Sequence, residues 1–146
     1  MRVRIKKLHP DAVIPTYATT GAAGFDLVAI EDLEMYPGQT KLIKTGLAFE
    51  IPEGYEIQVR PRSGLSLKTM LRVANSPGTI DADFRGEACV IMHLQEGGVF
   101  QLSSWIRKGD RIAQGVLCPI IQASFLEVDE LNSTVRGAGG FGSTGK

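Results

Sequence analysis

Five short polar segments of this 146-residue chain carry the residues that could do chemistry. Each places Asp, Arg, Ser or Gln beside glycines, in stretches where an ordinary β-protein needs no such polarity. Arginine forks bind phosphate oxygens, Mg²⁺ is held by one or two carboxylates together with the phosphates themselves, and a carboxylate can deprotonate water. The segments therefore indicate a site for a metal-bound polyphosphate, with Asp81 or Asp83 as the general base. They are residues 21–27, 60–66, 75–87, 107–114 and 136–146.

Each segment, taken alone, also has a structural explanation. Asp26 could cap a turn, Asp81 and Asp83 could flank a hairpin, and the arginines could form surface ion pairs. Only the combination of all five in one chain favours a function over these structural roles.

The last segment, RGAGGFGSTGK, combines five glycines with a lone aromatic ring, Phe141. Residues 140–146 also fit the first seven positions of the phosphate-binding pattern GxxxxGK[ST]. That motif works through a preceding strand and a following helix N-terminus, and neither is predicted here, so an NTPase loop is rejected. Consecutive glycines can still present backbone N–H groups to an anion, with Ser143 and Thr144 as further donors.

Composition and charge are those of an ordinary globular domain. The chain is 43% hydrophobic and 22% charged, with Lys+Arg and Asp+Glu balanced at 16 each. This balance gives no field that would attract nucleic acid or an anionic membrane. No apolar run approaches the roughly 20 residues of a membrane helix, and the basic N-terminus lacks the apolar core of a signal peptide. We expect one cytoplasmic domain without a nucleic-acid or membrane partner.

The cysteines and histidines do not suggest a metal site. Cys89 and Cys118 lie in apolar runs, which favours buried thiols over a disulfide. His9 and His93 have no neighbouring ligand-type residues in the sequence, so a zinc site or a histidine-activated nucleophile is not expected.

Strand patterns dominate the elements that must position the polar segments. Apolar residues alternate with polar ones, and Gly- or Pro-containing turns recur at short intervals, which indicates an all-β sandwich or barrel. One short helix is predicted at residues 63–69. The predicted strands are residues 2–6, 25–30, 40–51, 56–60, 88–94, 111–121 and 125–128.

The five segments, in this order, resemble the five motifs of the trimeric dUTP pyrophosphatases, or dUTPases. The third and fifth motifs together are highly specific, whereas PRSGL also occurs in the related dCTP deaminases. The resemblance extends from near residue 9 to the end of the chain. The matching stretches are AAGFDLVA at 22–29, PRSGLSLK at 61–68, NSPGTIDADFRGE at 75–87, RKGDRIAQ at 107–114 and RGAGGFGSTG at 136–145.

The resemblance implies a fold and an assembly. The fold is an all-β, distorted jelly-roll or β-barrel-like domain of residues 1–135, which forms a homotrimer with shared active sites. Residues 136–146, here called the C-terminal arm, are expected to be flexible and to close a neighbouring active site.

The implied reaction is hydrolysis of dUTP to dUMP and pyrophosphate by attack of water on the α-phosphorus, assisted by Mg²⁺. It would keep uracil out of DNA and supply dUMP for thymidylate synthesis. By position, Asp81 is expected to deprotonate the water, Arg136 to stabilise developing charge, and Asp26 to reach the metal ion through a bound water. The residues expected to bind substrate are Arg62, Ser63, Gly64, Asn75, Gly78, Thr79, Ile80, Phe84, Gln114, Phe141, Gly142, Ser143 and Thr144.

The resemblance also assigns parts of the substrate to these residues. A β-hairpin at about residues 75–84, in the third motif, would present main-chain groups to the uracil edge, and Phe141 would stack on the base. Phe84 stands where the family often has Tyr, and its ring would pack on the deoxyribose. Arg62 is expected to pair with Asp110 rather than to touch phosphate.

Two other functions fit parts of the pattern. A dCTP deaminase, alone or bifunctional, shares the fold but has a differently spaced third motif. A non-catalytic nucleotide sensor would not need the complete set of polar residues found here. Release of ammonia from dCTP would identify the first, and nucleotide binding without turnover the second.

Overall fold

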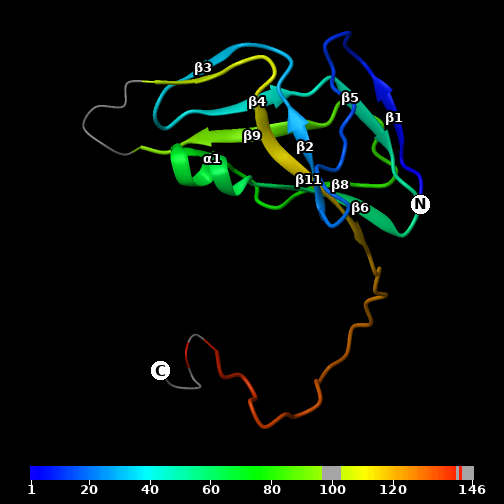
Figure 1. Cartoon of the computed structure of the whole chain (residues 1–146). Helices are drawn as coiled ribbons and strands as arrows, with labels where there is room; N and C mark the ends of the chain where they lie inside the picture. Colours follow the sequence, from blue (N-terminus) through cyan, green and yellow to red (C-terminus); the bar gives the residue numbers. More distant parts are fainter. Residues whose placement is uncertain (97–102, 141, 143–146) are drawn as a thin grey trace.

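The computed structural model describes residues 1–96, 103–140 and 142, and the regular secondary structure of these residues is nearly all strand (Figure 1). This confirms the all-β prediction. One short helix, α1 (Ser63–Lys68), interrupts the strands. The strands are β1 (Arg4–Lys7), β2 (Gly24–Val28), β3 (Leu33–Met35), β4 (Thr40–Lys44), β5 (Leu47–Glu50), β6 (Tyr55–Arg60), β7 (Leu71–Val73), β8 (Gly78–Ile80), β9 (Cys89–Leu94), β10 (Ser104–Ile106) and β11 (Arg111–Pro119).

The largest sheet has the strand order β2-β11-β6-β8, with every neighbouring pair antiparallel. Its residues alternate as a two-residue period requires, so that Ile57 and Val59 of β6 are buried while the side chains between them point to the other face. Strand β8 pairs only with β6 and therefore lies at the edge of the sheet. This edge strand carries third-motif residues 78–80, and fourth-motif residues 111–114 lie in β11 of the same sheet.

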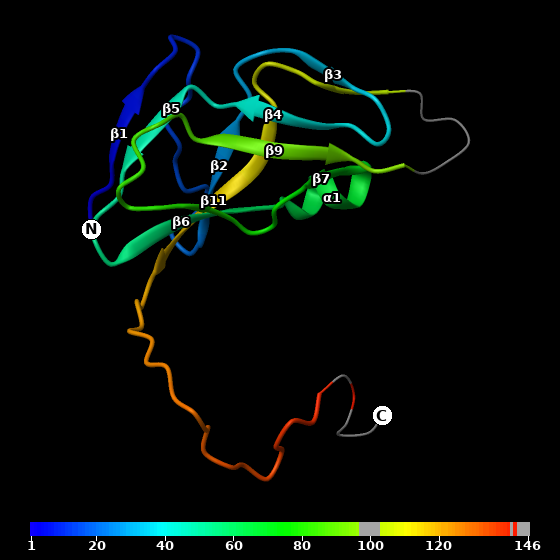
Figure 2. The ribbon, with the colours of Figure 1, turned by 180° about the vertical axis from the view of Figure 1, so that it is seen from behind.

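A three-stranded sheet, β4-β9-β7, and two ribbons, β1-β5 and β3-β10, complete the domain (Figures 1 and 2). The inward residues of β9, Val90, Met92 and Leu94, are fully buried and belong to the same core cluster as Ile57 and Val59. The core therefore joins the residues of both sheets, as in a sandwich.

Several predicted elements differ from the observed ones. The predicted strand 40–51 is broken at Gly46, whose φ of +68° suits a turn and not a strand. The predicted strand 125–128 is wrong, because these residues pair with no strand in the described structure. The predicted hairpin at 75–84 is also wrong, since β8 pairs with β6 and residues 81–84 form a turn. The helix begins at residue 63 as predicted.

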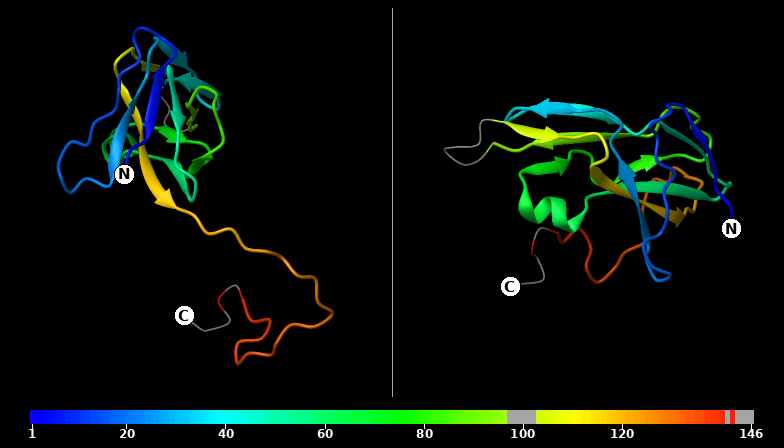
Figure 3. Two further views of the ribbon diagram at one scale, coloured as in Figure 1. Left: turned by 90° about the vertical axis from the view of Figure 1, so that its right-hand side faces the viewer. Right: turned by 45° about the horizontal axis from the view of Figure 1, so that its top comes forward.

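The chain leaves the domain after β11 (Figures 1 and 3). The N–H of Ile120 donates to Gly54 O at 2.9 Å, and the described residues from 121 to 140 form hydrogen bonds only among themselves. Residues 120–135, here called the extended segment, expose large apolar side chains, among them Ile121 at 98% and Phe125 at 96%. Apolar side chains so fully exposed are not packed against any of the described residues of the chain.

No helix in the described residues has the length and apolar character that crossing a membrane requires.

Thr45 connects the β4–β5 turn to the start of β9. Its side chain is fully buried, its hydroxyl donates to Ala88 O, and it accepts the N–H of Leu47 at 3.3 Å. We expect Thr45→Val, which keeps the shape but removes the hydroxyl, to lower the free energy of unfolding by about 1–3 kcal/mol, because Ala88 O then loses a donor. Urea denaturation measures this change.

The matched control is Thr40→Val at the exposed start of β4, where the hydroxyl lies 2.9 Å from His93 Nδ1. Its effect is expected to stay within about 0.5 kcal/mol because water replaces the lost partner. Equal losses in the two variants would contradict the structural role given to Thr45.

Candidate active site

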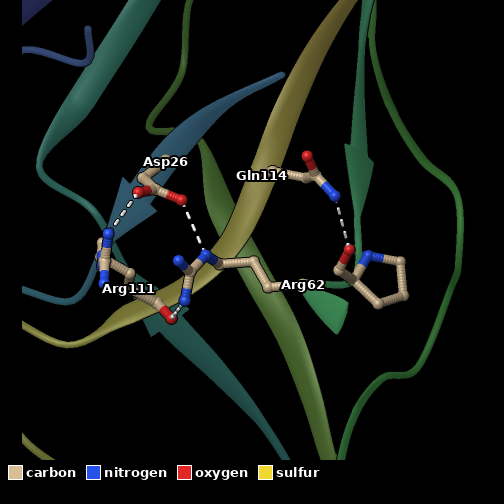
Figure 4. A network of polar contacts seen from close by, with 5 residues as sticks. Asp26, Arg62, Arg111 and Gln114 are labelled. Carbon is tan, nitrogen blue, oxygen red and sulfur yellow. Dashed lines mark hydrogen bonds and ion pairs between the residues drawn. The ribbon is translucent and has the colours of Figure 1, made fainter. Parts of the chain in front are cut away.

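Asp26 of β2 lies at the centre of a polar cluster between two arginines (Figure 4). Arg62 Nε donates to Asp26 Oδ1 at 2.7 Å, and Arg111 Nη1 donates to Oδ2 at 3.2 Å. Arg62 also donates to the backbone carbonyl of Arg111 at 3.3 Å. The Asp26 and Arg62 side chains are only 30% and 26% exposed, so this pair is held firmly, and Nη2 of Arg62 is left to bind an anion.

A β-bulge in β11 brings the fourth-motif side chains to Asp26. The register against β2 shifts between Arg111 and Ala113, so that Arg111 opposes Val28 while Gln114 opposes Asp26. Residues three apart in a regular strand point to opposite faces. The extra residue in the bulge places Arg111 and Gln114 on the same face as Asp26.

Gly24 leaves room for the Gln114 side chain beside this cluster. A Cβ at residue 24 would collide with Gln114 Oε1, while the Gln114 Nε2 donates to Pro61 O at 2.8 Å (Figure 4). Ser63 and Gly64, at the start of α1, line the same pocket, which has a volume of about 230 Å³. The first, second and fourth motifs thus meet in one concave site, here called the arginine pocket.

The predicted pair between Arg62 and Asp110 is not formed within the chain. Asp110 Oδ2 instead accepts the backbone N–H of Arg107 at 2.8 Å and closes the turn that precedes β11. Asp32 accepts the N–H of Lys108 at 2.8 Å, and this bond lowers the pKa of Asp32. Asp110 therefore shapes the turn, and Asp26 is the partner of Arg62.

A second pocket of about 300 Å³ lies at the free edge of β8 and is here called the edge pocket. An edge strand has a row of backbone N–H and C=O groups that no neighbouring strand uses. Asp81 follows β8 directly, and Phe84 covers the pocket with a ring that is 45% exposed. The predicted substrate residues that line this pocket are Asn75, Gly78, Thr79, Ile80 and Phe84.

Cys89, at the start of β9, also lines the edge pocket. Burial, followed by the charge of Glu87, raises the pKa of the Cys89 thiol to about 11. The thiol is therefore protonated near neutral pH and does not act as a nucleophile. Both cysteines of the chain are free and half-buried.

The two pockets share no lining residue in the single chain. Asp26, Arg62, Ser63, Gly64 and Gln114 are together in the arginine pocket. Asp81 lines the edge pocket with Asn75, Gly78, Thr79, Ile80, Phe84 and Glu87. Ser76 and Pro77 of the third motif instead line a separate pocket with Ser63 and Gln114. The single chain does not bring the predicted base to the predicted phosphate-binding residues.

The C-terminal arm contributes to neither pocket in the described residues. Arg136 Nε donates to Gly139 O at 2.8 Å, within the arm itself. Gly142 has a φ of +90°, which favours glycine. Phe141, Ser143 and Thr144 lie outside the described residues, so their predicted roles are unchanged.

Sequence reasoning missed two residues that shape these pockets. Arg111 was not among the predicted site residues, although its fourth-motif position beside Gln114 was a signal. Glu87 was not singled out either, yet its Oε1 accepts the N–H of Gly46 at 2.7 Å and joins the third motif to the β4–β5 turn. The Gly46 contact joins residues 41 positions apart, which no local pattern indicates.

The few carboxylates near the pockets fit a metal ion that is coordinated mainly by the phosphates of a bound nucleotide. Within residues 1–96, 103–140 and 142, no group of three or more His, Cys, Asp or Glu side chains could hold a metal ion. The Asp26 oxygens already accept from two arginines, so a metal ion could contact Asp26 without breaking these ion pairs only through a water. Mg²⁺ commonly keeps several waters and is bound through a few carboxylates plus phosphates.

Comparison with known proteins identifies relatives over the full chain. The family model described as dUTPase matches residues 10–145. A deoxyuridine 5'-triphosphate nucleotidohydrolase of Nautilia profundicola is 56% identical, with all of both chains covered. The protein of the same name from Wolinella succinogenes is 53% identical and covers all of this chain and 95% of its own.

Solved structures give the same result. A dUTPase of Staphylococcus bacteriophage 80alpha, in a structure with dUPNHPP, has a TM-score of 0.89 and 32% identity and covers 99% of each chain. A mutant dUTPase of phage phi11 of S. aureus has a TM-score of 0.80 and 26% identity, covering 89% of this chain and 98% of its own. That structure is described as revealing the coordination of a structural Mg(II) ion.

Proposed function

This chain belongs to the dUTPase family, and from that membership we propose that it is a dUTP diphosphatase that hydrolyses dUTP to dUMP and pyrophosphate. The observation that carries the proposal is the edge pocket, where the unpaired edge of β8, the Asp81 carboxylate and the Phe84 ring converge. The backbone groups of a strand edge can hydrogen-bond to a planar base, a carboxylate can orient a water molecule, and an aromatic face can pack on a sugar. These are the three recognition elements that a deoxyuridine nucleotide needs.

In the proposed mechanism, Asp81 orients a water molecule and takes one of its protons as the water oxygen attacks the α-phosphorus. The bond between the α-phosphorus and the oxygen that bridges to the β-phosphate breaks, and pyrophosphate leaves with that oxygen. Because attacking and leaving oxygens must be in line, positioning the phosphates contributes most of the catalysis.

Uracil specificity follows from the unpaired backbone of β8. Uracil has a donor at N3–H and an acceptor at O4, and cytosine reverses both. A site that is matched to uracil leaves buried backbone groups without partners when cytosine enters, and such mismatches discriminate by roughly 10⁴–10⁵. Thymine carries one extra methyl, which the residues of the edge pocket would exclude by a steric clash.

The arginine pocket is proposed to hold the phosphate chain. Ser63, Gly64 and Gln114 face the phosphates there, and Arg62 is oriented for them by Asp26. Mg²⁺, when bound to the triphosphate, would neutralise negative charge that develops in the reaction. Asp26 would reach that ion through a water, because its own oxygens are engaged by arginines.

A homotrimer would join the two pockets that one chain keeps apart. We propose that Asp81 of one subunit meets the arginine pocket of another, and that the C-terminal arm of a third closes over the nucleotide. The exposed apolar side chains of the extended segment support this arrangement, because another subunit could bury them. Arg136 would then stabilise charge on the transferring phosphoryl group, with Phe141 over the uracil and Gly142, Ser143 and Thr144 at the phosphates.

Release of pyrophosphate from dUTP, with and without Mg²⁺, tests the proposed activity directly. We expect Mg²⁺-dependent release from dUTP and at least 10⁴-fold lower kcat/KM for dCTP. Ammonia release from dCTP would instead identify a deaminase. Tight binding of dUTP without any turnover would identify a nucleotide sensor.

A further inference from the structure

The Phe84 ring lies directly against the backbone of Gly86. A Cβ atom at residue 86 would be 2.5 Å from Phe84 Cζ and 2.9 Å from Cε2, where carbon atoms normally stay about 3.5–4.0 Å apart. Residue 86 is not among the glycines with a positive φ. Glycine is therefore needed at residue 86 because the Phe84 ring occupies the space of a side chain, and not because the backbone adopts an unusual conformation.

The backbone around this contact is fixed at both ends. Phe84 N–H donates to Asp81 O at 3.2 Å, and Arg85 Nη1 donates to Ala82 O at 2.6 Å and to Phe84 O at 3.0 Å. At the other end, Glu87 holds the Gly46 N–H at 2.7 Å. With the backbone so constrained, a side chain at residue 86 would displace the ring and leave the main chain in place.

We propose that Gly86 is a specificity-determining residue. Because it has no side chain, the Phe84 ring can take the position in which it forms a wall of the sugar site and excludes a ribose 2′-hydroxyl. This inference rests on the proposed function, since it assigns Phe84 to the sugar of the nucleotide. A 2′-hydroxyl against the ring face would lose its water partners without gaining a hydrogen bond, and it would also crowd the ring. A displaced ring would leave space and water for the hydroxyl.

The test compares kcat/KM for dUTP and for UTP in the full-length protein and in Gly86→Ala. We expect the dUTP-to-UTP ratio to fall about tenfold or more in the variant, mainly because the dUTP value falls while the UTP value holds or rises. Gly21→Ala is the matched control, since nothing lies within 4 Å of a Cβ there and its φ is ordinary. It should keep the parent ratio.

A double-mutant cycle with Phe84→Ala shows whether Gly86 acts through the ring. If it does, Phe84→Ala and Phe84→Ala/Gly86→Ala will have the same ratio within about twofold, because no ring remains to displace. A purely structural role of Gly86 would instead add its loss to both backgrounds. An unchanged ratio in Gly86→Ala, or additive losses in the cycle, overturns the inference.

Calorimetric binding of dUMP and UMP gives the same comparison without turnover. If the parent protein releases no pyrophosphate from dUTP, the proposed function fails, but the binding ratio still tests Gly86. If the parent binds dUMP and UMP equally, the wall itself is absent and the inference fails. A circular dichroism melting curve of each variant shows that the comparison is made between folded proteins.

Discussion

Asp81→Asn is expected to lower kcat for dUTP hydrolysis by about 10²–10⁴ while leaving nucleotide binding nearly unchanged. The amide has the shape of the carboxylate but cannot accept the proton of the attacking water. Asp81 follows the last residue of β8 and lines the edge pocket with Phe84, so its side chain lies where the base and sugar are proposed to bind. Pyrophosphate release and dUMP titration measure the two quantities.

The control for this variant is Asp83→Asn. Asp83 is two residues further along and was the alternative base from sequence. It lines a pocket with Glu53 and Gln122 that Asp81 also lines, but of the two carboxylates only Asp81 lines the edge pocket. Its kcat is expected to stay within about twofold of the parent because it does not line the edge pocket. Full activity of Asp81→Asn, with a loss in Asp83→Asn, would exchange the two roles.

Ending the chain at Val135 is expected to reduce kcat/KM for dUTP by about 10³ or more. The loss combines the removal of Arg136, since an arginine that stabilises transferring phosphoryl groups contributes on the order of 10³–10⁵, with the removal of the covering arm. The melting temperature should be unaffected, because the described arm residues hydrogen-bond only within the C-terminal segment. A truncated protein with the parent's kcat/KM would eliminate the proposed role of the arm.

Two further variants separate the contributions to that loss. Arg136→Ala keeps the arm but removes the guanidinium, so its kcat should fall with little change in dUMP affinity. Arg136→Lys keeps the charge but not the planar fork, and it should recover only part of the rate. If both variants match the parent, the arm acts as a cover alone.

Mixing truncated chains with Asp81→Asn chains tests whether the arm acts between subunits. In a mixed trimer, one site can combine Asp81 from the truncated chain with an intact arm from the other chain. Co-refolded mixtures should therefore regain activity that neither parent chain has. No recovery in verified mixed trimers would mean that each arm closes the site of its own chain.

Local sequence patterns predicted much of the framework. The β-like run at residues 88–94 predicted the strand β9, and alternation in β6 predicted which face of that strand is buried, at Ile57 and Val59. Such alternation is readable because a strand with one buried face repeats every two residues. The short helix at residue 63 was also predicted from the sequence, and the family followed from the resemblance of the five segments to the dUTPase motifs.

The wrong predictions concern residues whose structure depends on distant partners. The segment 125–128 has the composition of a strand, but no neighbour in the described chain pairs with it. The segment 75–84 looked like a hairpin, yet β8 finds its partner in β6. Pattern and composition do not say which strand lies beside which, because that choice depends on the packing of the whole core.

The residue pattern alone was enough to predict an all-β fold, and the resemblance of five segments to the dUTPase motifs identified the family and the glycine-rich arm. The folded chain was needed to show that Asp26, Arg62 and Gln114 share one pocket while Asp81 lines another, that a bulge turns Arg111 and Gln114 to Asp26, and that Arg62 pairs with Asp26. It also revealed that the Phe84 ring packs in the space that a side chain at residue 86 would occupy. The physical reason is that spacing along the chain records the type and order of residues, whereas register, sheet edges and side-chain clearance arise from contacts between segments far apart in sequence.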